Sequence, residues 1–290
     1  MFVIIGFVVV LGCVIGGYLM VGGHLGILFQ PSEYIIIFGA AAGSLLIGNP
    51  KSVIFGVLKS FGPMLKGPRY NKDSYVETLC MLYSVFRLAK TKGDLALESH
   101  VEKPEESPIF QQFPGFLSDH HNVTFFCDYL RLLTLGTNNA HEIEAIIDAE
   151  IESHHHELHK TADAISNVGE AMPALGIVAA VLGIIHTMGS ITEPPEVLGH
   201  LIGGALVGTF SGVLMSYGFV SPMGRTLNLT YEADTVYLNC LKAGLLAHMQ
   251  GYAPQVSVEF ARKILPPEVT PSFQEIEEAV SSLGSASTSG

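Results

Sequence analysis

Two long apolar segments joined by a short polar link constrain the fold of this chain most strongly. Residues 167–222 read NVGEAMPALGIVAAVLGIIHTMGS, then ITEPPEVLGH, then LIGGALVGTFSGVLMSYGFVSP. Glu170 and Glu193 enclose 22 residues without Asp, Glu, Lys or Arg, and Glu196 and Arg225 enclose 28. A helix of about 20 apolar residues spans the roughly 30 Å hydrocarbon core of a bilayer. The stretch therefore predicts two membrane helices connected by a tight turn.

The composition agrees with a membrane protein. Charged residues make up 14% of the chain and the mean hydropathy is +0.40, whereas a soluble domain carries about a quarter charged residues. The formal net charge of −12 argues against nucleic-acid binding, which needs clustered Lys and Arg. The four cysteines form no CxxC pair, so neither a zinc ribbon nor a disulfide framework is predicted.

Two further apolar runs precede these segments. Met1–Val21 is long enough to span a bilayer. Because it lacks a basic start and an A-x-A site, it reads as a retained span and not as a cleaved signal peptide. Glu33 and Lys51 bracket the second run, Tyr34–Gly48, which is short and is expected either to tilt little or to extend toward Leu58. No acidic residue lies inside any of the four runs, so we expect the titrating group of an ion path to come from another protein.

The basic residues give the expected orientation. Eleven of the fifteen Lys and Arg lie in residues 51–170, and the other four follow the last span. By the positive-inside rule both regions are cytoplasmic, as are both termini. The predicted fold is an all-α membrane protein with four transmembrane helices and a large helical cytoplasmic domain between spans 2 and 3. The expected segments are spans 1 and 2 (1–58), the cytoplasmic domain (59–170), the ion-path hairpin of spans 3 and 4 (171–223), and a cytoplasmic tail with a disordered end (224–290).

The cytoplasmic region carries apolar stripes typical of helices. Two sets of residues recur at helical spacing: Tyr75, Leu79, Leu82, Phe86 and Ala89, and then Ile143, Ile147 and Ile151. A helical pattern over 128–162 is broken near Gly136–Asn139. The segment LESHVEKPEESP predicts a charged loop or turn, and the final SSLGSASTSG has the composition of a disordered end.

Small residues and prolines mark the two later spans. Gly204, Gly208 and Gly212 repeat every fourth residue, a spacing that predicts close helix packing in lipid. Pro173 opens the first span and Pro222 closes the second, and an internal proline leaves one carbonyl without its helical donor. At the cytoplasmic ends of their spans, two weakened helix ends could couple the arrival of an ion to movement. The simpler alternative is that each proline only starts or stops a helix.

The sequence contains no enzyme motif. GxSxG, GxxxxGK[ST] and a GxGxxG after a strand are absent, and the cluster His154, His155, His156 and His159 lacks zincin spacing. His155 and His159 share a helix face and could bind a metal adventitiously, but a solvated helix surface is favoured. Within the spans, His186 and the hydroxyl groups are each more simply structural. We therefore predict no catalytic residue, no bound cofactor and no metal site.

Several stretches resemble the MotA family, the ring subunits of the flagellar motor stator, within the MotA/TolQ/ExbB proton channel family. They are LESHVEKPEESPIF (97–110), DYLRLLTLG (128–136), HEIEAIIDAEIESH (141–154), MPALGIVAAVLGIIH (172–186), VGTFSGVLMSYGFVSP (207–222) and GYAPQVSVEFARK (251–263). The resemblance implies an inner-membrane pentamer around a dimer of MotB, which supplies the intramembrane aspartate. Protons that neutralise this aspartate would make the ring step and drive the rotor protein FliG.

The resemblance also implies roles for individual residues. Lys90 and Glu98 match rotor-facing charges of the family, and many relatives carry Arg at the first position. Glu150 matches an acid of the same rim. Pro173 and Pro222 match two prolines linked to torque generation.

The ion-path positions implied by the resemblance are Ala180 and Thr209, and Tyr217 is a further candidate because its hydroxyl can lend an oxygen to an ion. Sodium-driven relatives tend to carry Thr at the position of Ala180, where its oxygen can replace a water around a dehydrating cation. Alanine offers no oxygen, so the transported ion is predicted to be H⁺.

Three other functions stay open. The chain could be an ExbB/TolQ-like energiser of an outer-membrane transducer, although such proteins usually have three spans and lack the LESHVEKPEESP segment. It could also be a structural membrane scaffold without transport, or a metalloenzyme built on the histidine cluster.

Overall fold

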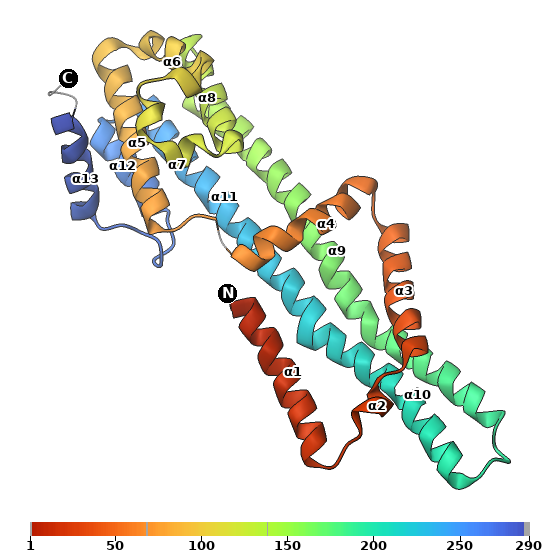
Figure 1. Cartoon of the computed structure of the whole chain (residues 1–290). Helices are drawn as coiled ribbons and strands as arrows, with labels where there is room; N and C mark the ends of the chain where they lie inside the picture. Colours follow the sequence, from red (N-terminus) through yellow and green to blue (C-terminus); the bar gives the residue numbers. More distant parts are fainter. Residues whose placement is uncertain (1, 68, 138, 287–290) are drawn as a thin grey trace. The chain divides into compact units, whose positions relative to one another are not determined.

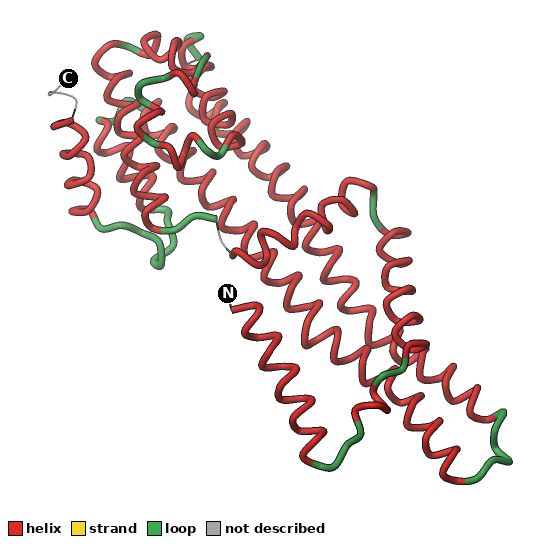
Figure 2. Tube along the Cα trace, in the orientation of Figure 1, coloured by secondary structure: helices red, strands yellow, loops and turns green. Residues whose placement is uncertain are grey.

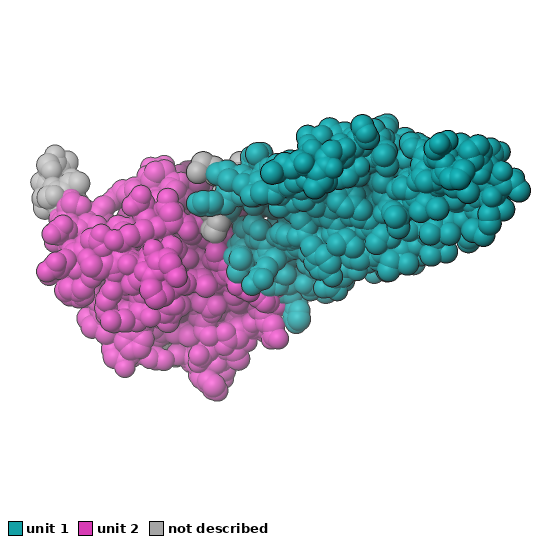
Figure 3. Space-filling view, turned by 90° about the horizontal axis from the view of Figure 1, so that it is seen from below, with its two compact units in different colours: residues 1–67, 156–231 teal, residues 68–155, 232–290 magenta. Residues whose placement is uncertain are grey.

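The computed structural model describes residues 2–67, 69–137 and 139–286. Every regular element within these ranges is a helix (Figures 1 and 2). The chain forms two compact units, unit 1 with residues 1–67 and 156–231, and unit 2 with residues 68–155 and 232–290 (Figure 3). These units differ from the four segments expected from hydropathy, because α9 (Ala140–Met188) and α11 (Ser221–Met249) each contribute residues to both.

Unit 1 holds the most apolar helices. It contains α1 (Phe2–Met20), α2 (Leu25–Leu28), α3 (Pro31–Gly48), α4 (Lys51–Lys66), the later part of α9, α10 (Pro195–Met215), the π-helical segment η4 (Ser216–Val220) and the start of α11. In the described part of the chain, four helical stretches are long and apolar enough to cross a membrane: Phe2–Met20, Leu25–Gly48, Ala140–Met188 and Pro195–Met249. Each of the four predicted spans is therefore present as a helix.

The second span ends earlier than predicted. α3 stops at Gly48 and α4 starts at Lys51, so the expected extension toward Leu58 is wrong. The cause is Pro50, which disfavours a helical backbone at the residue before it, and Asn49 is indeed extended. α4 is instead a separate helix that packs inside unit 1, where its valines join a core with residues of α9 and α11.

α1 is almost fully exposed within the single chain. None of its residues is buried, and its apolar side chains include Phe2, Val8 and Met20 at 65% exposure or more. One ring pair anchors it to the rest of unit 1, with the centroids of Phe7 and Phe219 5.0 Å apart. A continuous apolar surface of this kind requires lipid or another subunit to cover it.

Unit 2 is built around α5 (Lys72–Lys92). The other elements are η1 (Asp94–Leu97), α6 (Glu98–Glu102), η2 (Pro104–Glu106), η3 (Phe110–Gln112), α7 (Pro114–Leu117), α8 (His120–Thr134), the early part of α9, the later part of α11, α12 (Pro254–Lys263) and α13 (Phe273–Ala286). α12 and α13 both pack against α5 (Figure 1).

The predicted apolar stripes form the core of unit 2. The five stripe residues of α5 are at most 4% exposed, and the three isoleucines of α9 are at most 6% exposed. Burying each large apolar side chain stabilises the fold by about 1.5–3 kcal/mol. The predicted break near Gly136–Asn139 is confirmed, since α8 ends at Thr134 and α9 begins at Ala140.

Two predicted loops are partly helical. LESHVEKPEESP begins at Leu97, the last residue of η1, and forms α6 and η2, so the prediction of a loop or turn is wrong in detail, although these helices are only five and three residues long. In the tail, α13 continues to Ala286 and so includes the first six residues of SSLGSASTSG. Residues 287–290 lie outside the described part of the chain.

Candidate functional site

α9 and α10 form a hairpin in which their backbones almost touch. A Cβ added to Gly176 would lie 2.7 Å from the carbonyl oxygen of Gly208, and one added to Gly212 would lie 2.7 Å from the carbonyl oxygen of Met172. No side chain fits at these distances, so the glycine repeat is what allows the two helices to approach this closely. The predicted close packing of this hairpin is confirmed.

The structure places Ala180 and Thr209 at the same level of the hairpin. Ala180 is buried, and its amide nitrogen lies 2.9 Å from the position that a Cβ would take on Gly208. Thr209 follows Gly208 directly and is half-buried. Tyr217 lies further along the chain in η4, and its side chain is 68% exposed. Two of the three predicted ion-path residues thus lie together, and Tyr217 lies apart on an outer face of unit 1.

Glu33 is an acidic residue that the sequence interpretation left out of the spans. It lies in the first turn of α3, within the membrane-crossing stretch Leu25–Gly48, and is only 6% exposed. Its Oε2 lies 2.6 Å from the Cβ position of Gly208, and its Oε1 lies 3.3 Å from that of Gly183. Oε2 has no hydrogen-bond partner among the described residues. The prediction that no acid lies within the four spans is therefore wrong.

A signal for Glu33 was present in the sequence. Pro31 is favoured at the first position of a helix, and an acid in the first turn is favoured by the helix dipole. Glu33 could therefore have been placed inside the helix and not at its border. Its burial against α9 and α10 could not be inferred, because it depends on glycines about 150–175 residues away in the sequence.

The two prolines lie inside continuous helical structure. Pro173 is within α9, so the simpler alternative that it only starts a helix is wrong. Pro222 is the second residue of α11, and the π-helical segment η4 directly precedes this helix. The helix therefore continues past Pro222 instead of closing there. A π-helical turn is a common way to accommodate a distortion in a helix, and such turns are frequent at functional sites.

The backbone regions loosened by the two prolines touch each other. Pro173 cannot donate to the carbonyl of Gly169, and a Cβ on Gly169 would lie 2.5 Å from Oγ of Ser221 and 2.9 Å from its amide nitrogen. Ser221 immediately precedes Pro222. Gly169, which lies four residues before Pro173, and Ser221, which precedes Pro222, are therefore in contact within unit 1.

The three predicted rotor-facing charges all belong to unit 2 and are exposed. Lys90 lies in the last turn of α5, and its Nζ donates to the carbonyl oxygen of Gly251 at 3.1 Å. Glu98 begins α6. Glu150 lies on α9 and accepts a hydrogen bond from the hydroxyl of Tyr129. The three charged residues thus lie on three different helices, and Lys90 and Glu150 have different hydrogen-bond partners.

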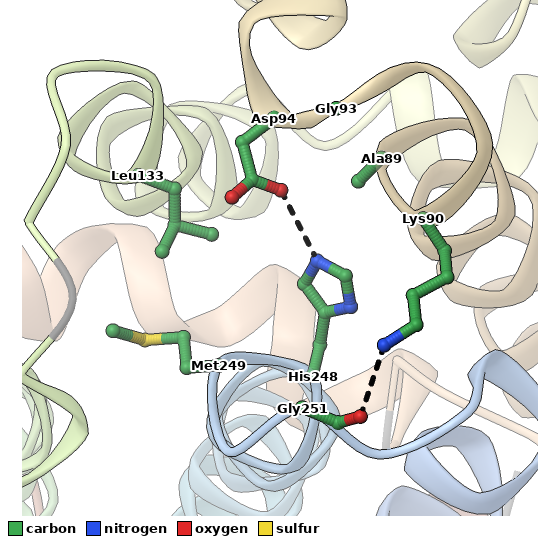
Figure 4. A pocket seen from close by; sticks show the side chains of 8 residues that line it. All are labelled: Ala89, Lys90, Gly93, Asp94, Leu133, His248, Met249 and Gly251. Atoms are coloured by element: carbon green, nitrogen blue, oxygen red, sulfur yellow. Dashed lines mark hydrogen bonds and ion pairs between the residues drawn. The ribbon is translucent and has the colours of Figure 1, made fainter.

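A cavity of about 400 Å³ lies beside Lys90 (Figure 4). Its lining includes Asp94, His248 and Gly251. His248 is only 8% exposed, and its Nε2 lies 3.6 Å from Oδ1 of Asp94. The sequence interpretation did not single out this histidine, because its partners come from α5 and η1, far away in the chain.

The histidine cluster shows no metal-binding geometry. Within residues 2–67, 69–137 and 139–286, no group of three or more His, Cys, Asp or Glu side chains is placed to hold a metal ion. The ring of His154 stacks on that of His121, with centroids 4.2 Å apart, and Nδ1 of His155 lies 3.0 Å from the Thr235 hydroxyl. These contacts favour the interpretation of the cluster as part of a helix surface.

Comparisons with known proteins agree with this architecture. Residues 4–93 match the family described as motility protein A N-terminal, and residues 118–239 match the MotA/TolQ/ExbB proton channel family. The chain is 44% identical to motility protein A of Escherichia coli (strain K12) and 42% identical to that of Salmonella typhimurium, in both cases over 97% of this chain and 95% of the relative.

A solved structure shares the fold. A chain in the structure of C. jejuni MotAB aligns with a TM-score of 0.77 at 20% identity, covering 92% of this chain and 96% of the other. The predicted fold class, four membrane helices with a large helical domain between the second and third, is confirmed by this likeness together with the four apolar helices.

Proposed function

Since this chain belongs to the MotA/TolQ/ExbB proton channel family and is a flagellar stator subunit, we propose that it couples proton flow across the bacterial inner membrane to rotation of the flagellar motor. The observation that carries this proposal is the buried seam between α9 and α10, where Ala180 meets Gly208 beside the carboxyl group of Glu33. The family is described by channel activity and not by an enzymatic reaction.

The chemistry of the seam favours protons as the transported ion. A partly dehydrated Na⁺ needs several oxygen ligands, and Ala180 supplies no side-chain oxygen at this level. A buried carboxyl group, in contrast, can bind and release a proton without a coordination shell, and ionisable groups inside membrane segments are functional by default. We therefore assign Glu33 to the proton path, together with Ala180 and Thr209. Tyr217 remains a candidate ion-path residue, and its exposed hydroxyl could lend an oxygen to the ion.

A second chain is expected to complete the path. A MotB-type partner would supply the membrane aspartate, and the relative solved in C. jejuni is titled MotAB. The exposed apolar surface of α1, together with Ile177, Val181 and Ile185 on α9, fits assembly into a ring around this partner. A pentamer around a MotB dimer is the stoichiometry we propose. The distribution of Lys and Arg favours cytoplasmic termini.

Unit 2 is proposed to contact the rotor. Lys90, Glu98 and Glu150 are exposed charges on three separate helices of this unit, which suits recognition of a charged protein such as FliG. Proton passage would then move unit 2 through the proline region of the hairpin, where Gly169 and Ser221 are in contact.

The test is rotation in a bacterial strain that lacks its own stator. The native chain, expressed with its MotB-type partner, should restore rotation of tethered cells. Lys90→Glu should abolish most of the torque, and charge reversal on the rotor should restore part of it. If the native pair assembles in the membrane but supports only an outer-membrane transducer, the ExbB/TolQ-like alternative is correct. If the Lys90→Glu variant generates normal torque, Lys90 does not take part in the rotor contact.

A further inference from the structure

The cavity beside Lys90 is built by two helix ends. α5 ends at Lys92 and turns at Gly93, and α11 ends at Met249 and turns at Gly251. Both glycines have a positive φ, +87° and +89°, that other residues rarely adopt. The turn after α5 brings Asp94 to the cavity, and the turn after α11 presents the carbonyl oxygen of Gly251 to Lys90 (Figure 4).

Lys90 is therefore held by an acceptor from a distant part of the chain. Its Nζ lies 3.1 Å from the Gly251 oxygen, at the carboxyl end of α11. The partial negative charge of a helix C-terminus favours a cation there. This single hydrogen bond sets where the Lys90 ammonium group lies relative to the surface of unit 2.

His248 forms the inner wall of the same cavity. Its ring stacks on Phe86, with centroids 4.6 Å apart and planes 8° apart, and Nε2 faces the carboxylate of Asp94. A carboxylate only accepts hydrogen bonds, so Asp94 favours the neutral tautomer with the proton on Nε2, which leaves Nδ1 as an acceptor. Nδ1 is buried and has no hydrogen-bond partner in the described part of the chain. It points to the side of the cavity on which Lys90 lies (Figure 4).

We propose that His248 is a positioning residue for Lys90: its neutral imidazole holds the ammonium group at Gly251, and protonation of the ring displaces that group from the cavity. In the neutral ring, the Nδ1 lone pair faces the cation and attracts it. In the protonated ring, Nδ1 carries a hydrogen and the imidazolium repels the ammonium group. The charge offered to the rotor is then sensitive to cytoplasmic acidification.

The charges around His248 set the direction of this effect. Burial lowers the pKa of His248 below its usual value, Asp94 opposes the shift, and Lys90 adds to it. His248 belongs to unit 2 and follows the apolar stretch that ends before Arg225. Because the pKa is lowered, the ring is neutral at neutral pH and Lys90 is held. Protonation and release therefore require a lower pH than an ordinary histidine would.

The experiment measures the position of Lys90 without using motility. The purified stator complex is treated with a trace of acetic anhydride across a pH series, and mass spectrometry gives the acetylation of Lys90 relative to Lys92. Lys92 is an exposed lysine of the same helix and serves as the internal control. In the native complex, this ratio should rise roughly fivefold or more as the pH falls through the titration of His248.

Two variants identify the titrating group. His248→Gln removes the titration, so the ratio should no longer depend on pH. Asp94→Asn keeps the histidine but removes the acid that favours its protonated form, so the rise should move to lower pH. A flat ratio in the native complex, or an unchanged rise in His248→Gln, would overturn the proposal. Should His248→Gln fail to assemble, the shift in Asp94→Asn decides, and no shift overturns the proposal.

The consequence for torque rests on the proposed function and is tested separately. When the cytoplasm is acidified at constant proton motive force, native motors should lose more speed than His248→Gln motors. If the labelling ratio behaves as expected and the two motors slow equally, the positioning of Lys90 stands and its assignment to the rotor contact fails.

Discussion

Gly208 of α10 and Ala180 of α9 are packed backbone to backbone, with the Ala180 amide nitrogen 2.9 Å from the position of a Cβ on Gly208. The Glu33 carboxyl group lies at the same point, 2.6 Å from that position. One glycine thus brings two membrane helices together and leaves room for a buried acid. The residues that pack α9 against α10 therefore also surround the carboxyl group that we assign to the proton path.

The first prediction concerns this contact. Gly208→Ala adds a methyl group where no space exists, so α9 and α10 must separate. We expect destabilisation of about 1–3 kcal/mol and loss of most complex in a pull-down with the MotB-type partner. Gly199→Ala is the matched control, because Gly199 lies in the same helix with open space around it. Equal assembly of the two variants would contradict the assignment of Gly208 to the seam.

The second prediction concerns the acid at the seam. Glu33→Gln keeps the shape of the side chain but cannot exchange a proton at this position. We expect motor rotation to slow at least about tenfold, equivalent to ~1.4 kcal/mol on the rate-limiting barrier, with normal amounts of complex in the membrane. Glu196→Gln, at an exposed acid in the first turn of α10, should rotate normally. Full speed in Glu33→Gln would show that Glu33 has only a packing role.

The third prediction concerns the prolines. Pro173→Ala restores the helical hydrogen bond to the carbonyl oxygen of Gly169. The helical conformation of α9 at this point should become more stable by up to about 3 kcal/mol, so α9 bends less easily. The complex should assemble in normal amounts and yet generate little torque in tethered cells. Pro63→Ala is the control, since Pro63 also lies inside a helix, α4, but outside the hairpin of residues 171–223. If Pro173→Ala generated full torque, the contact between Gly169 and Ser221 would have no part in coupling.

The fourth prediction is a stability difference in unit 2. Asp234 lies beyond the apolar part of the last span, and Oδ1 of its side chain is buried without a partner in the described residues. Burial raises the pKa of Asp234 to about 6, Arg69 opposes the shift, and Asp119 adds to it. Because the folded pKa lies above the unfolded value, ionisation of Asp234 destabilises the fold as the pH rises through about 6.

Asp234→Asn should therefore stabilise the protein at neutral pH by on the order of 2 kcal/mol, and the gain should shrink as the pH falls from about 6 and be lost below about 4. Thermal unfolding of the purified complex at several pH values measures this. Asp119→Ala should act in the opposite sense, since Asp119 accepts hydrogen bonds from Arg69 at 2.8 Å and from Tyr70 at 2.7 Å. A pH-independent gain in Asp234→Asn would exclude its carboxyl group as the cause.

The parts of the fold that follow from periodicity could be predicted. Three features are periodic patterns within single helices and can be recognised from the sequence alone. They are the membrane spans, the apolar stripe from Tyr75 to Ala89 on α5 and the glycine repeat of α10. Their burial and close packing are as expected. The helical break between Thr134 and Ala140 was also marked, by a glycine and two asparagines.

The missed features depend on contacts that are distant in sequence. Hydropathy treats a charged residue as the border of a span, so Glu33 was placed outside α3 although α9 and α10 cover it. No sequence pattern distinguishes the π-helical turn before Pro222 from an ordinary α-helix. Pro222 was therefore interpreted as the end of a helix. His248 and Lys90 share a cavity only because two glycine turns bring the ends of α5 and α11 together.

The central claim is that proton flow through the hairpin drives rotation, and single-motor speed tests it most directly. Motors built from this chain and its MotB-type partner are followed while external sodium is varied at a fixed proton gradient, and then while the proton gradient is varied at fixed sodium. The speed should rise and fall with the proton gradient and stay constant across the sodium series, because Ala180 offers no ligand to sodium. A speed that follows sodium and ignores the proton gradient would contradict proton coupling.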